Sequence, residues 1–189
     1  MNLPIVVGIT GASGVIYGVE ILRALKKLEV PTHLIITEAG ARTLILETEF
    51  TLAEIKALAD VVHSNRDIAA SISSGSFLTR GMIVAPCSIK TLSSIANSYD
   101  ADLVARAADV TLKERRPLVL MVRETPLHKG HLELMARAAD YGATIQPPMP
   151  AFYHKPQTLQ DIVDQGVARA LDQLGVTHTL FPRWDDRNT

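Results

Sequence analysis

The sequence predicts an α/β fold in which a doubly wound parallel sheet carries helices on both faces. Three observations predict it. Short apolar runs alternate with amphipathic stretches, glycine or proline punctuates many joins, and the first apolar run passes directly into a turn of glycines and one serine at Pro4–Gly14. At 189 residues the chain can bury about 70% of its unfolded surface. We therefore expect a single domain over residues 1–189, with an extended arm from about residue 175, where the sequence turns polar.

The first half of the chain supplies two expected strands, both rich in β-branched residues. The run Ile5–Thr10 opens the sheet and leads into an amphipathic helix at Gly14–Leu28. A second strand at His33–Thr37 follows, and two shorter helices occupy Gly40–Leu46 and Leu52–Leu58.

The second half repeats this alternation. The expected strands are Met82–Ala85, Leu118–Val122 and Thr144–Ile145. The expected helices are Ile89–Asn97, Ala101–Lys113, Leu132–Tyr141 and Leu159–Leu174. In a sheet of this kind ligands bind beyond the carboxyl ends of the strands, where the strand order reverses.

The glycine turn after the first strand suggests a phosphate site. Gly8, Gly11 and Gly14 let backbone approach a ligand, and the following helix offers N–H groups to an anion. Their spacing is neither the Gly-x-Gly-x-x-Gly of dinucleotide folds nor a P-loop, so the turn does not name the nucleotide. A purely structural glycine turn is the alternative.

Composition excludes several classes of function. A net charge of −1 argues against nucleic acid or an anionic membrane as the main partner. The single cysteine, Cys87, rules out a disulfide framework or a cysteine metal cluster. No apolar run approaches the ~20 residues of a membrane span, and no basic leader is present, so we expect a cytoplasmic protein. Hydrophobic residues at 47% suggest that other subunits cover some of the surface.

Polar residues follow four successive expected strands. The segments are Thr10–Ser13, Thr37–Glu38, Pro86–Thr91 and Arg123–Pro126. Because the carboxyl ends of parallel strands meet at one edge, we expect these segments to form one site.

Each member of this set has a structural alternative. Ser88 suits an N-cap, with or without an anion at the same N–H groups. Cys87 beside a proline is better explained as a buried small residue than as a nucleophile. Arg123 can clamp phosphate with two hydrogen bonds, or pair with Glu124.

A proline-rich segment, Met149–Pro156, holds Phe152 and Tyr153 rigidly and suits either a wall over a flat ligand or a connector. Histidines show no metal-ligand spacing beyond His128 and His131, which could share a helical face. We expect no metal.

Seven motifs in order resemble the flavin prenyltransferases of the UbiX type, within the flavoprotein decarboxylase-like superfamily. They span nearly the whole chain: Gly11-Ala-Ser-Gly14, Leu46-Glu-Thr48, Ser73–Phe77, Pro86-Cys-Ser-Ile-Lys-Thr91, Arg106–Arg115, Arg123-Glu-Thr-Pro-Leu127 and Met149-Pro-Ala-Phe-Tyr153. The resemblance implies a Rossmann-like flavin-binding subunit assembled into a homododecamer, with active sites at subunit contacts.

The resemblance also implies a reaction. Reduced FMN is alkylated at N5 by dimethylallyl phosphate and closed at C6, without a metal. The product, prenylated FMN, then serves a UbiD-type decarboxylase, often in ubiquinone biosynthesis.

The family's functional residues carry over to matching positions. Those implied around FMN are Gly11, Ala12, Ser13, Thr37, Ser88, Ile89, Lys90, Thr91 and Arg123. Those implied to bind the dimethylallyl phosphate are Lys113, Arg123, Tyr153, Arg169 and Trp184. The catalytic set is Ser13 and Glu47, which remove protons, and Glu124, the acid toward the departing phosphate.

Two of these residues rest on the resemblance alone. Without it, Glu47 would be a helix-surface residue and Arg169 an ordinary exposed arginine. The chain also departs from the family at Leu78 and Arg80, where Arg and Asp are common, and at Lys129, where the family often continues apolar.

Three other functions are alternatives to prenyl transfer. A flavoprotein that oxidatively decarboxylates a cysteine-ended substrate would need an early catalytic histidine and an asparagine motif, whereas this chain has His33 within an expected strand and no such asparagine motif. A non-catalytic FMN-binding assembly subunit would not need the phosphate set. An NAD enzyme, with Glu38 on the ribose, conflicts with the glycine spacing.

Overall fold

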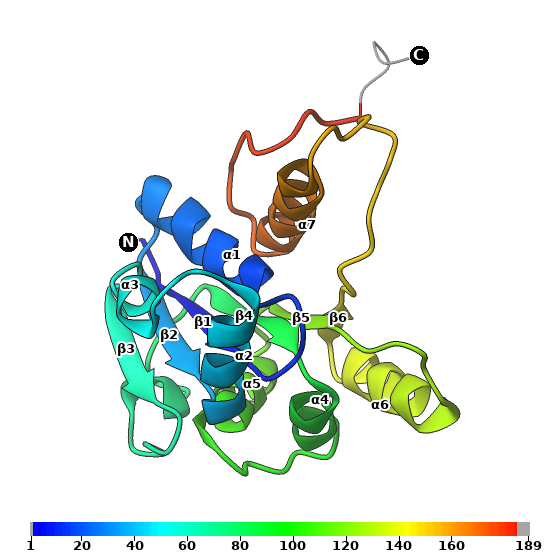
Figure 1. Ribbon diagram of the computed structural model, residues 1–189. Helices are drawn as coiled ribbons and strands as arrows, with labels where there is room; N and C mark the ends of the chain where they lie inside the picture. Colours follow the sequence, from blue (N-terminus) through cyan, green and yellow to red (C-terminus); the bar gives the residue numbers. More distant parts are fainter. Residues whose placement is uncertain (1, 185–189) are drawn as a thin grey trace.

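The computed structural model of the chain describes residues 2–184, which are built around one six-stranded parallel sheet (Figure 1). Its strands are β1 (Ile5–Ile9), β2 (Thr32–Ile36), β3 (Val61–Ser64), β4 (Gly81–Cys87), β5 (Leu118–Val122) and β6 (Ala143–Ile145). They lie in the order β3-β2-β1-β4-β5-β6, so the direction of winding reverses between β1 and β4. The predicted fold class is confirmed.

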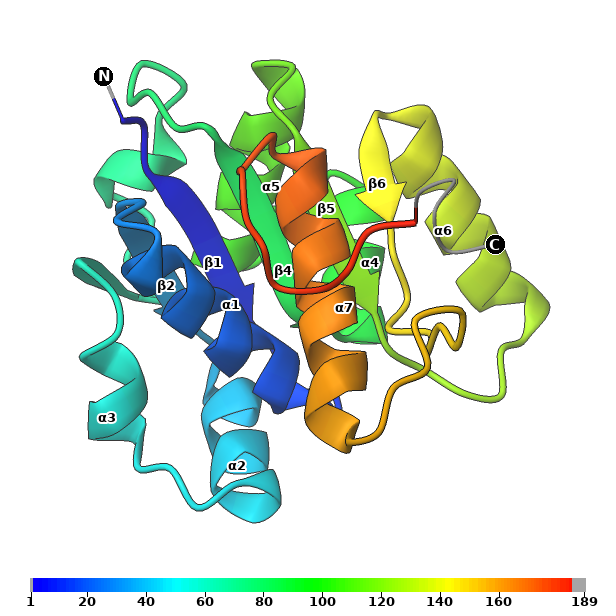
Figure 2. The same cartoon turned by 90° about the horizontal axis from the view of Figure 1, so that it is seen from above.

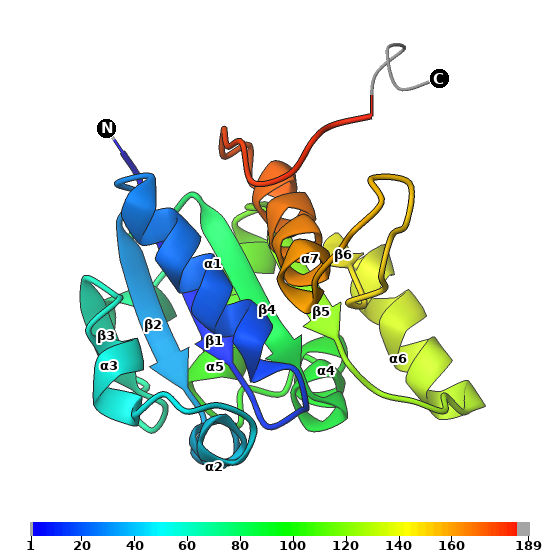
Figure 3. The same cartoon turned by 45° about the horizontal axis from the view of Figure 1, so that its top comes forward.

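Six α-helices and a short 3-10 turn lie between the strands along residues 2–184, and a seventh helix follows the last strand. They are α1 (Val15–Lys27), α2 (Glu38–Glu47), α3 (Leu52–Lys56), the 3-10 turn η1 (Ser71–Ser73), α4 (Ile89–Ala96), α5 (Leu103–Lys113), α6 (Lys129–Asp140) and α7 (Leu159–Gln173). Helices α1 and α7 pack side by side on one face of the sheet, and α4, α5 and α6 lie on the other (Figure 3).

The core consists of two layers, one on each face of the sheet. Along β1, Val7 belongs to the layer under α1 and α7, whereas Val6 belongs to the layer over α4 and α5. Both are almost fully buried. This alternation shows that β1 is covered on both faces, as a central strand of a parallel sheet requires.

The five expected strands and seven expected helices are all present, with shifts of a few residues at their ends. Capping explains two shifts: the Thr37 hydroxyl accepts the Gly40 N–H at the start of α2, and Asp102 accepts the Ala105 N–H at the start of α5. One strand, β3, was not predicted. It has four residues, pairs with β2 alone at the edge of the sheet, and exposes 39% of both Val61 and Val62, so its hydrophobic signal is weak.

The segment after α7 runs back across that helix to Trp184 (Figure 2). It leaves α7 through Gly175, whose φ of +64° favours glycine. Arg80 holds this turn: its Nε donates to the Leu174 carbonyl at 2.7 Å, and its Nη2 contacts the Gly175 carbonyl. Arg80, one of the departures from the family pattern, therefore caps α7. Within residues 2–184 no helix has the length and apolarity to cross a membrane.

Candidate functional site

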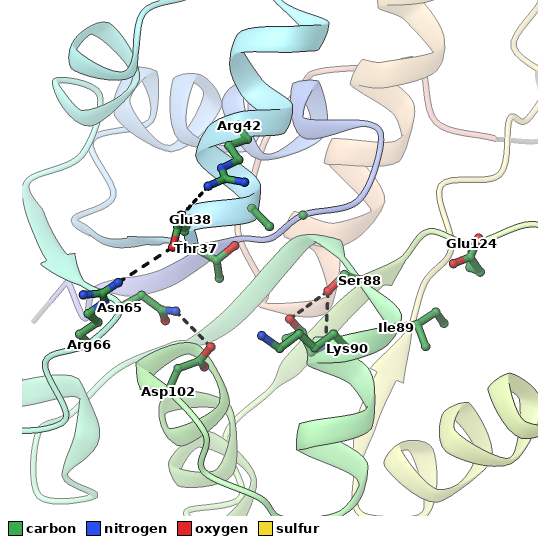
Figure 4. Close-up of a pocket in the computed structure, with 13 residues that line it drawn as sticks. Thr37, Glu38, Arg42, Asn65, Arg66, Ser88, Ile89, Lys90, Asp102 and Glu124 are labelled. Carbon is green, nitrogen blue, oxygen red and sulfur yellow. Dashed lines mark hydrogen bonds and ion pairs between the residues drawn. The ribbon is translucent and has the colours of Figure 1, made fainter.

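A cavity of about 650 Å³ lies beyond the carboxyl ends of the strands, beside the reversal of strand order (Figure 4). Its lining comes from the starts of α2 and α4, the turn after β1 and the loops after β3, before α5 and after β5. These residues are Gly11, Thr37, Glu38, Ala39, Arg42, Asn65, Arg66, Ser88, Ile89, Lys90, Thr91, Asp102 and Glu124. The cavity occupies the place expected from the fold, and we call it the main cavity.

A fully buried threonine joins two of the segments that form this cavity. The Thr10 hydroxyl donates to the Pro86 carbonyl at 2.7 Å and accepts the Ser88 N–H at 2.8 Å. The Thr10 N–H also donates to the Pro86 carbonyl, at 3.3 Å. The end of β1 and the loop after β4 are thereby held at a fixed separation.

Two helices begin at the main cavity, and each has a hydroxyl cap. Thr37 accepts the Gly40 N–H at 3.0 Å at the start of α2. Ser88 accepts the Thr91 N–H at 3.3 Å at the start of α4, and its hydroxyl donates to the Thr91 hydroxyl at 3.1 Å. Backbone N–H groups and the positive ends of two helix dipoles therefore meet at one cavity, an arrangement suited to a phosphate.

The first N–H groups of α1, after the glycine turn, already have a partner within the protein. The Glu47 carboxylate accepts the N–H groups of Gly14 and Val15 at 2.8 and 3.3 Å, so a side chain of this protein caps α1. Gly14 has a φ of +92°, and a Cβ at Gly11 would overlap the Cβ of Ala39 on α2. The lack of a side chain at Gly11 therefore lets helix α2 pack closely against this turn.

Glu47 is exposed, as its sequence context alone indicated, but its carboxylate has defined partners. It is the last residue of α2, and its carboxylate reaches across to the residue that follows Ser13. The structure thus brings Ser13 and Glu47 to one corner beside the main cavity.

The loop after β5 contributes Arg123 and Glu124. The Arg123 N–H donates to the Cys87 carbonyl at 3.1 Å, which keeps this loop beside the loop after β4. Glu124 lines the main cavity, and its carboxylate accepts the Thr125 N–H at 3.0 Å rather than forming the ion pair with Arg123 that was the structural alternative.

The residues implied to bind the dimethylallyl phosphate do not gather in one place. Tyr153 and Trp184 meet edge to face, with ring centroids 5.7 Å apart, and line a cavity of about 170 Å³ together with Arg183. Arg169 lines another cavity, of about 240 Å³, with Gln146 and Met149.

Lys113 is farther away. Its helix, α5, begins beside the main cavity at Asp102 and ends with Lys113 eleven residues later. At 1.5 Å per residue this is about 16 Å of helix, so Lys113 lies toward the amino ends of the strands, away from the main cavity. There its ammonium contacts Glu114. Within one chain the structure does not bring Lys113 to the main cavity.

One carboxylate binds a histidine and two arginines on α7 and in the segment that follows it. Asp172 accepts from Arg169 at 2.8 Å, from Arg183 at 2.7 Å and from His178 at 3.0 Å. Burial raises the pKa of the Asp172 carboxyl, but its hydrogen bonds with Arg183 and the neighbouring charges outweigh burial, and the pKa lies below its usual value. Arg169 is therefore more than the ordinary exposed arginine that its helix pattern indicated.

Sequence reasoning missed five residues of the main cavity: Ala39, Arg42, Asn65, Arg66 and Asp102. Asn65 and Arg66 follow the unpredicted strand β3, and Asn65 donates to Asp102 at 3.0 Å. The paired valines at the start of β3 were the one signal that could have placed this loop at the carboxyl edge. Arg42 pairs with Glu38 at 2.8 Å on the exposed side of α2.

The chain is similar to known flavoproteins over nearly its whole length. The Flavoprotein family matches residues 1–171. The flavin prenyltransferase UbiX of Escherichia coli K12 is 61% identical over 183 residues, which cover 95% of this chain and 97% of that protein.

Solved structures of UbiX-type proteins are similar to this chain over nearly its whole length as well. The complex of AnUbiX (PadA1) with FMN and dimethylallyl pyrophosphate superposes with a TM-score of 0.96 at 46% identity, covering 98% of each chain. A dodecameric FMN-dependent UbiX-like decarboxylase from Escherichia coli O157:H7 has a TM-score of 0.94 at 49% identity, covering 97% of this chain and 100% of that one. An FMN-dependent cysteine decarboxylase, TvaF, reaches 0.64 at 12% identity, which shows the fold alone.

Cys87 should be chemically inert in the folded protein. It is fully buried at the end of β4, and burial raises the pKa of its thiol to about 12. Because the thiolate is the reactive form, we expect a disulfide reagent at pH 8 to modify the native protein at least about a thousandfold more slowly than the urea-unfolded chain. Rapid, stoichiometric modification of the native protein would reinstate the cysteine as a nucleophile.

Proposed function

The chain belongs to the flavoprotein family and, within it, to the flavin prenyltransferases of the UbiX type, and we propose that it joins the dimethylallyl group of dimethylallyl phosphate to N5 and C6 of reduced FMN. The main support for this proposal in the structure is the set of residues that line the main cavity. Gly11, Thr37, the segment Ser88–Thr91 and Glu124 all belong to the implied site, and all line that one cavity.

The main cavity suits FMN in size and chemistry. Its volume of about 650 Å³ lies within the range of about 300–1,000 Å³ for small-molecule sites. The caps at Thr37 and Ser88 offer hydroxyls and helix N-termini to the flavin phosphate, and Lys90 adds a cation. Ala12, Ser13 and Arg123 adjoin this lining in sequence and complete the proposed flavin set. Reduced FMN supplies the nucleophilic ring atoms.

The remaining work falls to this chain's side chains. We assign Lys113, Arg123 and Arg169 to the donor's phosphate, with the Tyr153 hydroxyl as a further donor. Tyr153 and Trp184 are assigned to the dimethylallyl group, whose developing positive charge an aromatic face attracts and whose surroundings must exclude water. Their edge-to-face contact supports that role.

Three groups are assigned to proton transfer. Glu124 is assigned as the acid that, in its protonated form, gives a proton to the departing phosphate, and its position in the lining of the main cavity supports this role. Ser13 and Glu47 are assigned to proton removal from the flavin. The carboxylate of Glu47 already holds the N–H groups beside Ser13, which supports a fixed position for the pair.

The donor half of the site is proposed to be completed by another copy of the chain. Lys113 lies at the end of α5 remote from the main cavity, so it can serve a flavin only across a subunit contact. Assembly into a homododecamer, as in the dodecameric UbiX-like relative, would provide such contacts.

The wider setting follows from family membership. We propose that the product, prenylated FMN, passes to a UbiD-type decarboxylase, often in ubiquinone biosynthesis, and that the protein acts in the cytoplasm. We also propose that residues 1–189 form one flavin-binding domain whose arm begins at about residue 175. A non-catalytic FMN-binding subunit remains the alternative function, and it would leave the donor set without a use.

Anaerobic incubation with reduced FMN and dimethylallyl phosphate tests the activity. We expect the flavin extracted from the protein to gain one five-carbon unit by mass spectrometry. Arg123→Ala should weaken the use of dimethylallyl phosphate while partly keeping FMN, because one phosphate-binding guanidinium is lost. Recovery of bound but unaltered FMN from the wild-type protein would leave the non-catalytic alternative in its place.

Mixed oligomers test the shared site. Lys113→Ala and Arg123→Ala should each be nearly inactive alone. If the two residues of one site come from different copies, random assembly should restore both in about a quarter of the sites. Prenyl transfer is measured after mixing by unfolding and refolding, with native mass spectrometry to verify mixed assembly. Verified mixed oligomers no more active than either parent would show that both residues serve one site from one chain.

A further inference from the structure

Asp172 binds Arg169, which lines the cavity beside Gln146, and Arg183, which lines the cavity beside Tyr153, and we infer that it is a positioning residue for the donor half of the site. Its carboxylate orients Arg169 on α7 and, through Arg183, holds the arm that carries Trp184. The inference rests on the proposed function, since it deepens the roles given there to Arg169 and Trp184.

The contacts use both carboxylate oxygens of Asp172. Oδ2 accepts from Arg169 Nη1 at 2.8 Å and from Arg183 Nη1 at 3.2 Å. Oδ1 accepts from Arg183 Nη2 at 2.7 Å and from His178 Nε2 at 3.0 Å. Arg183 is therefore bound by two hydrogen bonds in the fork geometry that fixes a guanidinium most firmly.

His178 anchors the arm to the same point. Its Nδ1 accepts the Leu180 N–H at 3.4 Å, so Nε2 carries the proton and donates to Asp172 and to the Ala168 carbonyl, both at 3.0 Å. The side chain of His178 is 1% exposed. Six residues of the arm, from His178 to Arg183, are thus tied at both ends to one carboxylate.

The carboxylate of Asp172 is much less exposed to solvent than the two arginines that bind it. The side chain of Asp172 is 15% exposed, whereas those of Arg169 and Arg183 are 48% and 52% exposed. Because a guanidinium has five N–H donors, Arg169 can keep its bond to Asp172 and still bind a phosphate with others. The largely buried carboxylate of Asp172 thereby fixes the guanidinium of Arg169, which remains exposed to the cavity that it lines.

The same carboxylate links the residues of two cavities. Arg169 lines the cavity that includes Gln146, while Arg183 and Trp184 line the cavity that includes Tyr153. Trp184 follows Arg183 directly and meets the Tyr153 ring edge to face. Displacement of Arg183 from Asp172 would therefore move one wall of the proposed dimethylallyl site.

The test compares Asp172→Asn with Asp164→Asn in the full-length protein. Both remove one carboxylate from α7, but Asp164 accepts a hydrogen bond from Gln160 and does not contact the arm. Asp172→Asn should raise the KM for dimethylallyl phosphate about tenfold to a hundredfold, as loss of charge-assisted hydrogen bonds would. Its affinity for FMN should not change. Asp164→Asn should match the wild type in both.

Trp184, the only tryptophan of the chain, gives a readout independent of turnover. In Asp172→Asn its emission should shift to longer wavelength and acrylamide should quench it more strongly, because the arm is released. A KM and a Trp184 emission equal to those of Asp164→Asn would overturn the inference. Loss of folding alone, without a donor-specific effect, is excluded by the unchanged affinity for FMN.

Arg183→Gln covers the case in which Asp172→Asn does not fold. It leaves the contact of Asp172 with Arg169 in place, so Trp184 should still become more accessible; unchanged quenching would overturn the inference. If the wild-type protein binds FMN but transfers no prenyl group, the proposed function fails. Quenching of Trp184 by dimethylallyl phosphate, compared between wild type and variants, then decides the positioning role separately.

Discussion

The hydroxyl of Thr10 holds together the two segments on which the main cavity depends. It donates to the Pro86 carbonyl and accepts the Ser88 N–H, with no solvent exposure. The constraint is needed because the chain winds in opposite directions from β1 and β4, so the loops after these strands diverge. With Thr10 in place, the turn at Gly11 and the cap at Ser88 keep one spacing, and the start of α4 faces the start of α2.

The proposed site has two parts, a flavin part and a donor part, that obey different constraints. The flavin part belongs to the sheet edge of one chain, where buried hydrogen bonds and helix caps fix the backbone. The donor part, as proposed, would depend on long charged side chains and on the arm that Asp172 binds through Arg183, and it would draw on Lys113 of another copy. Such a division allows flavin to bind before the donor half is complete.

Much of this arrangement could be predicted from sequence, because strand runs and helix caps are local. Thr37 and Ser88 follow apolar runs directly, and their roles as caps agree with that pattern. Glu47 could not be derived in this way, since its contact with Gly14 joins residues 33 positions apart. The same applies to Asp172, whose partners His178 and Arg183 lie in an irregular segment. The edge strand β3 was not predicted because half of its residues are polar and three of the four are exposed.

The affinity of Thr10→Val for FMN tests the account most directly. Valine keeps the shape of threonine but leaves the Ser88 N–H without its acceptor, so we predict a dissociation constant at least about tenfold higher by titration of flavin fluorescence. Thr10→Ser should stay close to wild type. Thr111→Val is the matched control, because that buried hydroxyl bonds only within its own helix, to the Ala107 carbonyl. Unchanged affinity of a folded Thr10→Val protein would contradict the claim that this link sets the flavin site.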